Sequence, residues 1–306
     1  MRNAFIKTLV EYAKNNRDVE LITGDLGYGV LNAFSDILPN QFINAGISEQ
    51  NMTGVAAGMA KEGKIVFTYS IGNFPTMRCL EQIRNDCAYH NLNVKIVCVG
   101  GGLVYGSHGM SHHATEDFAI MRALPNVIVV APGDLVEAEC VTKAIIEAQG
   151  TCYLRLGRGG EKQIHEKIDK FELGKAIKIK EGNRVAIFST GAILDEALDT
   201  AEKLNENGIS TALYSFPTIK PIDKDVIIKY SNKCDLIVTI EEHNIIGGFG
   251  GAVAEVMTEE ITKCKLLKIG INDEYTAIVG EQKYLRTQYK IDAENIVNRI
   301  KDMEEK

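Results

Sequence analysis

The chain lacks the sequence features that mark several protein classes. No apolar run approaches the roughly 18 residues of a membrane-spanning helix, and no Lys/Arg-rich run is present. With a net charge of −7, we expect no binding to nucleic acid or to a membrane. The seven cysteines include no C-x-x-C pair, which is typical of reduced structural thiols in a cytoplasmic protein. We also expect no metal site built by this chain alone.

What is present is the composition of a globular protein. The 306 residues are 45% hydrophobic and 25% charged, with only six prolines, and they are enough for two domains. The first residues, MRNAFIKTLVEYAKNN, predict an amphipathic helix rather than a signal peptide, because they contain no continuous apolar core.

Short runs rich in β-branched residues alternate with helix-period segments. These runs show little polar alternation, which is typical of parallel strands covered on both faces. They are VELITGD (19–25), KIVFTYS (64–70), VKIVCVG (94–100) and NVIVVAP (126–132). The alternation indicates a doubly wound α/β domain with a mostly parallel sheet over residues 1–160.

The composition becomes charged and Gly-punctuated after this domain. We interpret residues 161–183 as a linker with room for a small hairpin. The alternation resumes over residues 184–306, which predicts a second, smaller α/β domain with Asp223 as a helix cap. Its segment GGFGGAV (247–253) fits either a phosphate loop at a helix start or close helix–sheet packing, and the pattern does not separate the two.

Candidate functional residues follow the predicted strands of the first domain. In open α/β sheets ligands bind at the carboxyl ends of strands. Asp25 follows the first strand and Phe74 the second, and the loop GGGLVYGSHGMSHHATED after the third contains His108, His112 and His113. The three histidines fit two interpretations equally well: a polar functional site, or loop residues that are simply solvated. Zinc is disfavoured because no Cys or second His pair accompanies them.

Glu49 stands out in the mostly apolar stretch NAGISEQNMTGVAAG. Taken alone, it reads as a carboxylate at the start of a helix, where the positive end of the helix dipole favours it. Its Ala, Gly, Ile and Val neighbours would desolvate it, which raises the pKa of a carboxyl group and favours a shared proton.

Several longer segments occur together in a characteristic order: AGISEQNMTGVAAGMA, then FTYSIGNFPTMRCLEQIRND, then GSHGMSHHATEDFAIMRALPNVIVVAPGD. They resemble the pyrimidine-binding domain of the transketolase family of thiamine diphosphate enzymes. The tail, from RVAIFSTGAILDEAL to TIEEHNIIGGFGGAVAE, is similar to the C-terminal domain of that family. The resemblance covers nearly the whole chain and is strongest to the C-terminal half of split transketolases, whose activity is shared between two polypeptides.

The resemblance implies a cofactor role for part of the site. Glu49 matches the family glutamate that hydrogen-bonds the cofactor pyrimidine and favours its imino tautomer. Phe74 matches the aromatic wall of the pyrimidine, with Tyr69 as a second choice. Asp25 matches an acidic residue close to the cofactor.

The resemblance also implies substrate contacts. His112 matches the histidine that contacts the donor substrate, with His113 as the alternative one residue along. His108 stands where transketolases of the family have an acidic residue that reads the donor's hydroxyl configuration, and we expect it to line the same site. Arg158 matches the arginine that holds a sugar phosphate, a role suited to a planar guanidinium.

Arg155, a neighbour of that phosphate-binding arginine, and Arg2, at the N-terminus, are further candidates for binding substrate phosphate.

The family binds the cofactor diphosphate and Mg²⁺ through a G-D-G motif, which this sequence lacks. The resemblance therefore implies an N-terminal partner subunit that supplies those ligands, in an α₂β₂ assembly where copies of this chain also contact each other. The expected reaction is transfer of a two-carbon ketol unit from a ketose phosphate to an aldose phosphate. The alternative is the β subunit of a thiamine diphosphate-dependent 2-oxo acid dehydrogenase complex, since SIGNFPTMRCLEQI also resembles those proteins.

Overall fold

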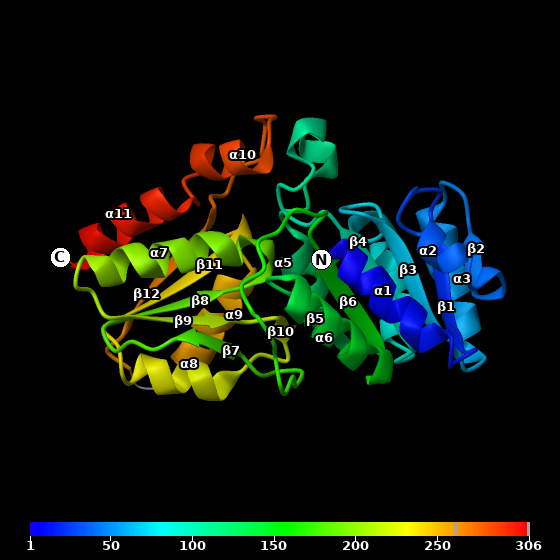
Figure 1. Cartoon of the computed structure of the whole chain (residues 1–306), viewed down its shortest axis with the longest axis horizontal. Helices are drawn as coiled ribbons and strands as arrows, with labels where there is room; N and C mark the ends of the chain where they lie inside the picture. Colours follow the sequence, from blue (N-terminus) through cyan, green and yellow to red (C-terminus); the bar gives the residue numbers. More distant parts are fainter. Residues whose placement is uncertain (260–261, 305–306) are drawn as a thin grey trace.

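The computed structural model of the chain describes residues 1–259 and 262–304. Within them the chain forms two β-sheets, each with helices on both faces (Figure 1). The predicted architecture of two doubly wound α/β domains is confirmed. None of the helices in the described residues is both long enough and apolar enough to cross a membrane.

The first sheet has the strand order β10-β5-β6-β4-β3-β1-β2. All neighbouring strands run parallel except β10, which pairs antiparallel with β5. Its strands are β1 (Val19–Thr23), β2 (Phe42–Asn44), β3 (Ile65–Ile71), β4 (Val94–Val99), β5 (Val127–Val130), β6 (Thr151–Leu156) and β10 (Thr218–Lys220). The four predicted strands are β1, β3, β4 and β5, whereas β2, β6 and β10 went unpredicted.

Side chains alternate between the two faces of this sheet. Leu21, Phe67 and Val97 pack under α1 and α6, whereas their neighbours Val66 and Ile96 pack on the opposite face under α3, α5 and the π-helix. Both faces are buried, so these strands read as continuous apolar runs. The helices are α1 (Arg2–Ala13), α2 (Asn32–Ser35), α3 (Glu49–Lys61), α4 (Leu80–Gln82), α5 (Asp117–Ala123) and α6 (Leu135–Glu147), with a π-helix at Ile83–Ala88.

The second sheet has the order β12-β11-β8-β9-β7 and is parallel except at β7. Its strands are β7 (Ile177–Lys180), β8 (Val185–Ser189), β9 (Thr211–Ser215), β11 (Leu236–Asn244) and β12 (Lys265–Ile271). Helices α7 and α11 cover one face, and α8 and α9 cover the other (Figure 1). The helices are α7 (Leu194–Glu206), α8 (Lys224–Ser231), α9 (Phe249–Thr258), α10 (Gln282–Gln288) and α11 (Ala293–Glu304).

Strand β7 lies inside the segment interpreted as a linker. It forms no hairpin of its own, because its partner is β9, more than 30 residues further on. The polar residues of this segment suit an edge strand, which is only half covered. The predicted cap at Asp223 is confirmed, since its side chain accepts a hydrogen bond from the Val226 amide at the start of α8.

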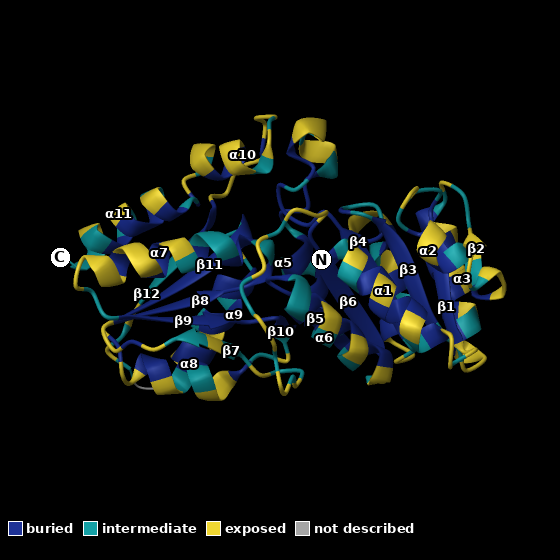
Figure 2. Ribbon diagram, in the orientation of Figure 1, coloured by how far each residue is buried: buried dark blue, intermediate teal, exposed yellow. Residues whose placement is uncertain are grey.

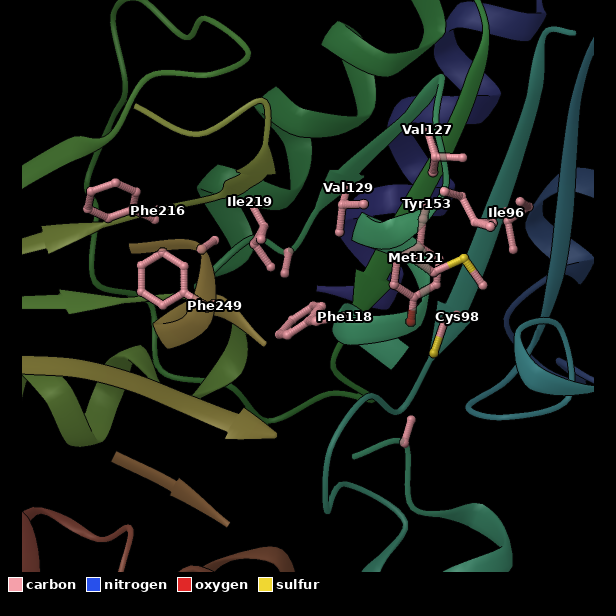
Figure 3. Packing of buried hydrophobic residues seen from close by; sticks show 14 of the residues in the cluster. Ile96, Cys98, Phe118, Met121, Val127, Val129, Tyr153, Phe216, Ile219 and Phe249 are labelled. Atoms are coloured by element: carbon pink, nitrogen blue, oxygen red, sulfur yellow. The ribbon is translucent and has the colours of Figure 1, made fainter. Parts of the chain in front are cut away.

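The two domains share one hydrophobic cluster. Phe118 and Met121 of α5 belong to one buried cluster with Phe216, Ile219 and Phe249 of the C-terminal half (Figure 3). Strand β10 extends this junction by adding to the first sheet. The buried strands run into the junction, while exposed residues concentrate on the outer helices and loops (Figure 2). The domains are therefore joined through an apolar core.

The glycine segment 247–253 is explained by close packing. The carboxylate of Glu241 accepts hydrogen bonds from the amides of Phe249 (2.6 Å) and Gly250 (2.8 Å). A Cβ on Gly250 would lie 2.7 Å from Thr239 Oγ1. The N-terminus of α9 is thus already capped by a carboxylate, which leaves no place for a phosphate.

Candidate active site

The predicted site residues gather along the carboxyl edge of the first sheet. Asp25 follows β1, Glu49 begins α3 after β2, Phe74 follows β3, and the histidine loop follows β4. We use the name histidine loop for residues 100–116. Strands of one parallel sheet present these loops side by side, as the sequence pattern requires.

Glu49 is the first residue of α3, and it is only 3% exposed. Gly46, with φ of +73°, turns the chain from β2 into this helix, a conformation that glycine adopts without strain. The sequence predicted apolar surroundings for this carboxylate, but in the structure a charged side chain also contacts it. Its Oε2 accepts a hydrogen bond of 2.8 Å from Nη1 of Arg78, whose side chain is 46% exposed.

Arg78 also contacts the second candidate cofactor residue. Its guanidinium lies over the ring of Phe74, 4.5 Å from the ring centroid. Arg78 therefore joins Glu49 to Phe74. Within the described residues no hydrogen bond reaches Oε1 of Glu49, so one carboxylate oxygen stays available as an acceptor.

Asp25 organises the loop beside Glu49. Its Oδ1 accepts hydrogen bonds from the Asn44 side chain (3.0 Å) and from the Tyr28 hydroxyl (2.7 Å). These two bonds, that of Asn44 first, hold the pKa of Asp25 below its usual range. Asn44 in turn accepts from the amides of Asp25 and Gly46, so it links the β1 loop to the turn that presents Glu49.

Aromatic and cationic side chains continue from Phe74 along the edge. The Phe74 ring lies 5.2 Å from that of His112, edge to face, and His112 lies 5.0 Å from His108. Tyr105 contacts both histidines, and the guanidinium of Arg158 lies 5.2 Å from its ring. The predicted residues Phe74, His112, His108 and Arg158 thus form one connected surface.

The two adjacent histidines have opposite environments. His112 is partly exposed beside Phe74, and burial followed by the charges of His108 and His113 lowers its pKa. His113 is 1% exposed and points into the C-terminal domain, where its Nδ1 meets the hydroxyl of Thr276 at 2.5 Å. The geometry presents His112, and not His113, to the open side of the site.

Among the three arginines, only Arg158 and Arg2 lie near the open surface. Arg158 is exposed and Arg2 is partly exposed, and the charges of both act on Tyr105. Arg155 is 5% exposed and paired with Asp117 at 3.0 Å. Its Nη2 donates to the carbonyls of Ala114 and Glu242, so its guanidinium is committed to the domain junction.

Tyr69 lies inside the core. It is 1% exposed and stacks against Phe5 of α1 at 6.3 Å. Its ring therefore offers no face to a ligand, and of the two aromatic candidates only Phe74 lies at the site.

Sequence reasoning missed Arg78 and Tyr105. Arg78 stands four residues after Phe74, a spacing that places side chains on one side of a helical turn. Tyr105 is the single aromatic in the glycine-rich part of the histidine loop, where a large ring has no secondary-structure reason to occur. Both signals were present in the sequence.

One group of residues with metal-ligand chemistry lies away from this edge, within the described part of the chain. Asp134, Glu137 and His165 have ligand atoms within 4.8 Å of one another. Oδ2 of Asp134 already accepts from the amides of Ile164 (2.9 Å) and His165 (2.7 Å), and Oδ1 caps α6 by accepting from the Glu137 amide. The group fastens the start of the linker to the first domain.

Residues 1–160 match the model of the transketolase pyrimidine binding domain, and residues 174–296 match that of the transketolase C-terminal domain. Fold and site together define a chain of the transketolase type of thiamine-dependent enzymes. The chain belongs to the transketolase family.

The chain is similar along its length to relatives of its own size. It is 43% identical over 303 residues to the putative transketolase C-terminal section of Methanocaldococcus jannaschii, covering 98% of this chain and 95% of the relative. It is 34% identical to one subunit of the apulose-4-phosphate transketolase of Phocaeicola vulgatus, covering 96% and 94%. A split-gene transketolase, solved as an inactive β₄ tetramer, superposes with a TM-score of 0.88 at 36% identity, covering 98% and 96%.

These relatives place the chain as the C-terminal subunit of a split transketolase, a transketolase-type transferase. The alternative of a 2-oxo acid dehydrogenase β subunit is not favoured, because the family models and these relatives are transketolases.

Proposed function

We propose that this subunit acts with an N-terminal partner to transfer a two-carbon ketol unit from a ketose phosphate to an aldose phosphate. Thiamine diphosphate, shared between the two chains, would supply the carbon nucleophile when bound. The observation that carries the proposal is Glu49, a buried carboxylate beside an aromatic ring at the carboxyl edge, with one oxygen that accepts no hydrogen bond from any described residue.

The residues of the site fit one half of the cofactor. Oε1 of Glu49 can accept a hydrogen bond from a protonated pyrimidine nitrogen and hold that proton between the two atoms. Phe74 offers a ring for stacking, and Asp25 holds the adjoining loop in place through Asn44. The chemistry of these groups matches an aminopyrimidine, whereas a diphosphate would need cations or Mg²⁺ ligands that we assign to the partner.

Substrate contacts follow from the same surface. His112 and His108 provide hydrogen-bonding imidazoles beside Phe74, where a sugar's hydroxyl and carbonyl oxygens can be held. The lowered pKa of His112 keeps a neutral imidazole available near neutral pH, able both to donate and to accept. Arg158, with Arg2 near the same tyrosine, supplies positive charge for the substrate phosphate.

Exposed apolar side chains support a partner chain over this edge. Tyr28 is 78% exposed and bonds Asp25, Ile47 is 79% exposed two residues before Glu49, and Met77 is 40% exposed next to Arg78. Large exposed apolar groups around a polar site are typical of a protein interface. An α₂β₂ assembly in the cytoplasm would cover them, and the seven unpaired cysteines are consistent with that compartment.

The proposal is tested by reconstitution. This chain, alone and mixed with the product of the adjacent reading frame, is assayed with thiamine diphosphate and Mg²⁺ for ketol transfer from xylulose 5-phosphate to ribose 5-phosphate. Activity of the mixture only is expected. Decarboxylation of a 2-oxo acid without ketol transfer would overturn the proposal.

A further inference from the structure

The histidine loop has two sides, and the C-terminal domain holds one of them. His108 and Met110 (51% exposed) face outward with the open site. Leu103 and His113, in contrast, are fully buried against the second domain. We propose that the C-terminal domain positions the substrate-facing histidines by clamping this loop, and that Glu242 and Thr276 are the positioning residues.

Glu242 fixes the first part of the loop. Its Oε1 accepts a hydrogen bond of 2.6 Å from the Leu103 amide. The carboxylate is itself held by Arg286 Nε at 2.6 Å and by Gln282 Nε2 at 2.9 Å, and it is 4% exposed. A carboxylate with its remaining lone pairs satisfied by α10 is a rigid acceptor for the loop amide.

Thr276 fixes the second part of the loop through His113. The His113 Nε2 lies 3.3 Å from the Gly106 carbonyl, which can only accept, so Nε2 carries the proton. Burial lowers the pKa of His113 and favours the neutral ring. Nδ1 must then accept from the Thr276 hydroxyl, at 2.5 Å. One histidine ring thus ties the loop to itself and to the second domain.

The loop backbone approaches the C-terminal domain as closely as glycine permits. A Cβ on Gly102 would lie 2.5 Å from Oε1 of Glu242, and one on Gly106 would lie 2.4 Å from the Gly280 carbonyl. The Gly280 amide donates to the Gly106 carbonyl, and the Asn244 amide donates to the Thr115 carbonyl at 2.8 Å. Contacts from two segments of the second domain, residues 242–244 and 276–280, therefore reach one loop.

These polar contacts are not needed merely to join the domains. The apolar cluster around Phe118 and Phe249 already does so, and Lys220 adds hydrogen bonds to the carbonyls of Arg122 and Leu124 away from the loop. The clamp instead determines where His112 lies, because His112 is covalently next to His113. The inference rests on the proposed substrate role of His108 and His112.

The test compares Thr276→Val, which keeps the side-chain shape but removes the hydroxyl, with Thr276→Ser, which keeps the hydroxyl. Lys220→Met is the matched control, since it removes interdomain hydrogen bonds that do not touch the loop. Amide hydrogen exchange of the full chain is followed in peptides covering residues 103–113. Exchange is expected to rise roughly tenfold in Thr276→Val and to stay within about twofold of wild type in the other two.

The same variants are then assayed in the complex with the N-terminal partner. For Thr276→Val we expect the donor KM to rise roughly three- to tenfold, with the acceptor KM and kcat within about twofold. Unchanged loop exchange, or equal effects of Thr276→Val and Lys220→Met, would overturn the clamp. If Thr276→Val does not fold, Glu242→Gln takes its place with the same criteria. A wild-type complex without ketol transfer would refute the proposed function, while the exchange measurement would still decide on the clamp.

Discussion

Two buried carboxylates at the carboxyl edges of the two sheets differ in how completely they are satisfied. Glu49 is 3% exposed and Glu242 is 4% exposed. Glu242 accepts from a backbone amide, a glutamine and a buried arginine, whereas Glu49 has one described hydrogen-bond partner, the half-exposed Arg78. Burial alone does not separate a functional carboxylate from a structural one. The Glu49 oxygen that accepts no hydrogen bond within the described residues is the difference on which its proposed cofactor role rests.

The same contrast separates His112 from His113. His113 spends both ring nitrogens on contacts within the chain, while His112 has only the Ser111 hydroxyl near Nδ1 and keeps Nε2 free of hydrogen bonds within the described residues. The open side of the site is thus built from groups with spare hydrogen-bonding capacity, and the clamped side from groups that have none left.

The largest effect is expected from Glu49→Gln. It removes the carboxylate that we propose shares a proton with the cofactor pyrimidine, so kcat of the reconstituted complex should fall by ~10²–10⁴. The free energy of unfolding should change little, because a glutamine still fits the site. Steady-state kinetics and chemical denaturation measure the two effects. A kcat within a few-fold of wild type contradicts the role of Glu49.

Glu242→Ala, unlike Glu49→Gln, should lower the free energy of unfolding. It leaves Arg286 without its closest partner at the domain junction, although Asp195 still lies 2.9 Å away. Breaking a buried ion pair costs about 3–5 kcal/mol, and Asp195 should keep the loss near the lower value. Guanidinium denaturation of the full chain measures it. A loss no larger than that of Glu49→Gln would remove the distinction between the two carboxylates.

Arg158→Ala tests the same contrast between two arginines. Losing an exposed charge-assisted contact to phosphate should raise the KM for phosphorylated acceptors by roughly 10- to 100-fold, with stability unchanged. An unphosphorylated acceptor is the control, and it should be affected little. Arg155→Ala should instead destabilise the fold, because Arg155 pairs with Asp117 in the junction. Equal losses for both acceptors would count against a phosphate contact.

The smallest effect concerns two histidines whose pKa values should be shifted in opposite directions from the ordinary value. Burial, His108 and His113 lower the pKa of His112. For His165 burial opposes the charged ring, but the hydrogen bond to Asp134 and the charge of Glu137 raise its pKa overall. NMR titration of the full chain should therefore place His112 below, and His165 above, the ordinary value of about 6.5. The reverse order would contradict this electrostatic description.

The shift of His165 also fixes the sign of a stability effect. A raised pKa in the folded chain means that its stabilisation is full below about pH 6.5 and is lost as the pH rises through the folded-state value. Burial raises the pKa of Glu137 to about 7, which also lowers stability as the pH rises above about 4.5. The stability advantage of wild type over His165→Gln should accordingly be largest below about pH 6.5 and shrink as the pH rises above that value. A constant difference would contradict this linkage.

Much of the fold was predictable because its signals are local. The apolar runs of β1, β3, β4 and β5 are buried on both faces, and this burial is what their lack of polar alternation predicts. Strand β2 was missed because its residues are partly or fully exposed. Strand β7 was taken for linker because it is a polar edge strand, and its pairing with β9 has no local signature.

The candidate site also has features that the sequence predicts and features that it does not. Position along the chain was enough to bring Asp25, Phe74 and the histidine loop to one edge, since each follows a predicted parallel strand. Glu49 joins them through β2, a strand that the sequence did not predict. Other features of the site depend on contacts between distant segments. They are the exposure of His112 rather than His113, the burial of Tyr69 and Arg155, and the ion pair of Arg78 with Glu49. Thr276, for instance, lies 163 residues from His113. No spacing rule in the sequence reports such a contact.

The most direct test of the central claim, that this chain holds one half of a shared cofactor site, is equilibrium binding of thiamine diphosphate with Mg²⁺ by calorimetry. We predict no measurable binding to this chain alone, binding to its mixture with the N-terminal partner, and weaker binding when the mixture carries Glu49→Ala. Binding of the cofactor by the isolated chain as tightly as by the mixture would contradict the account.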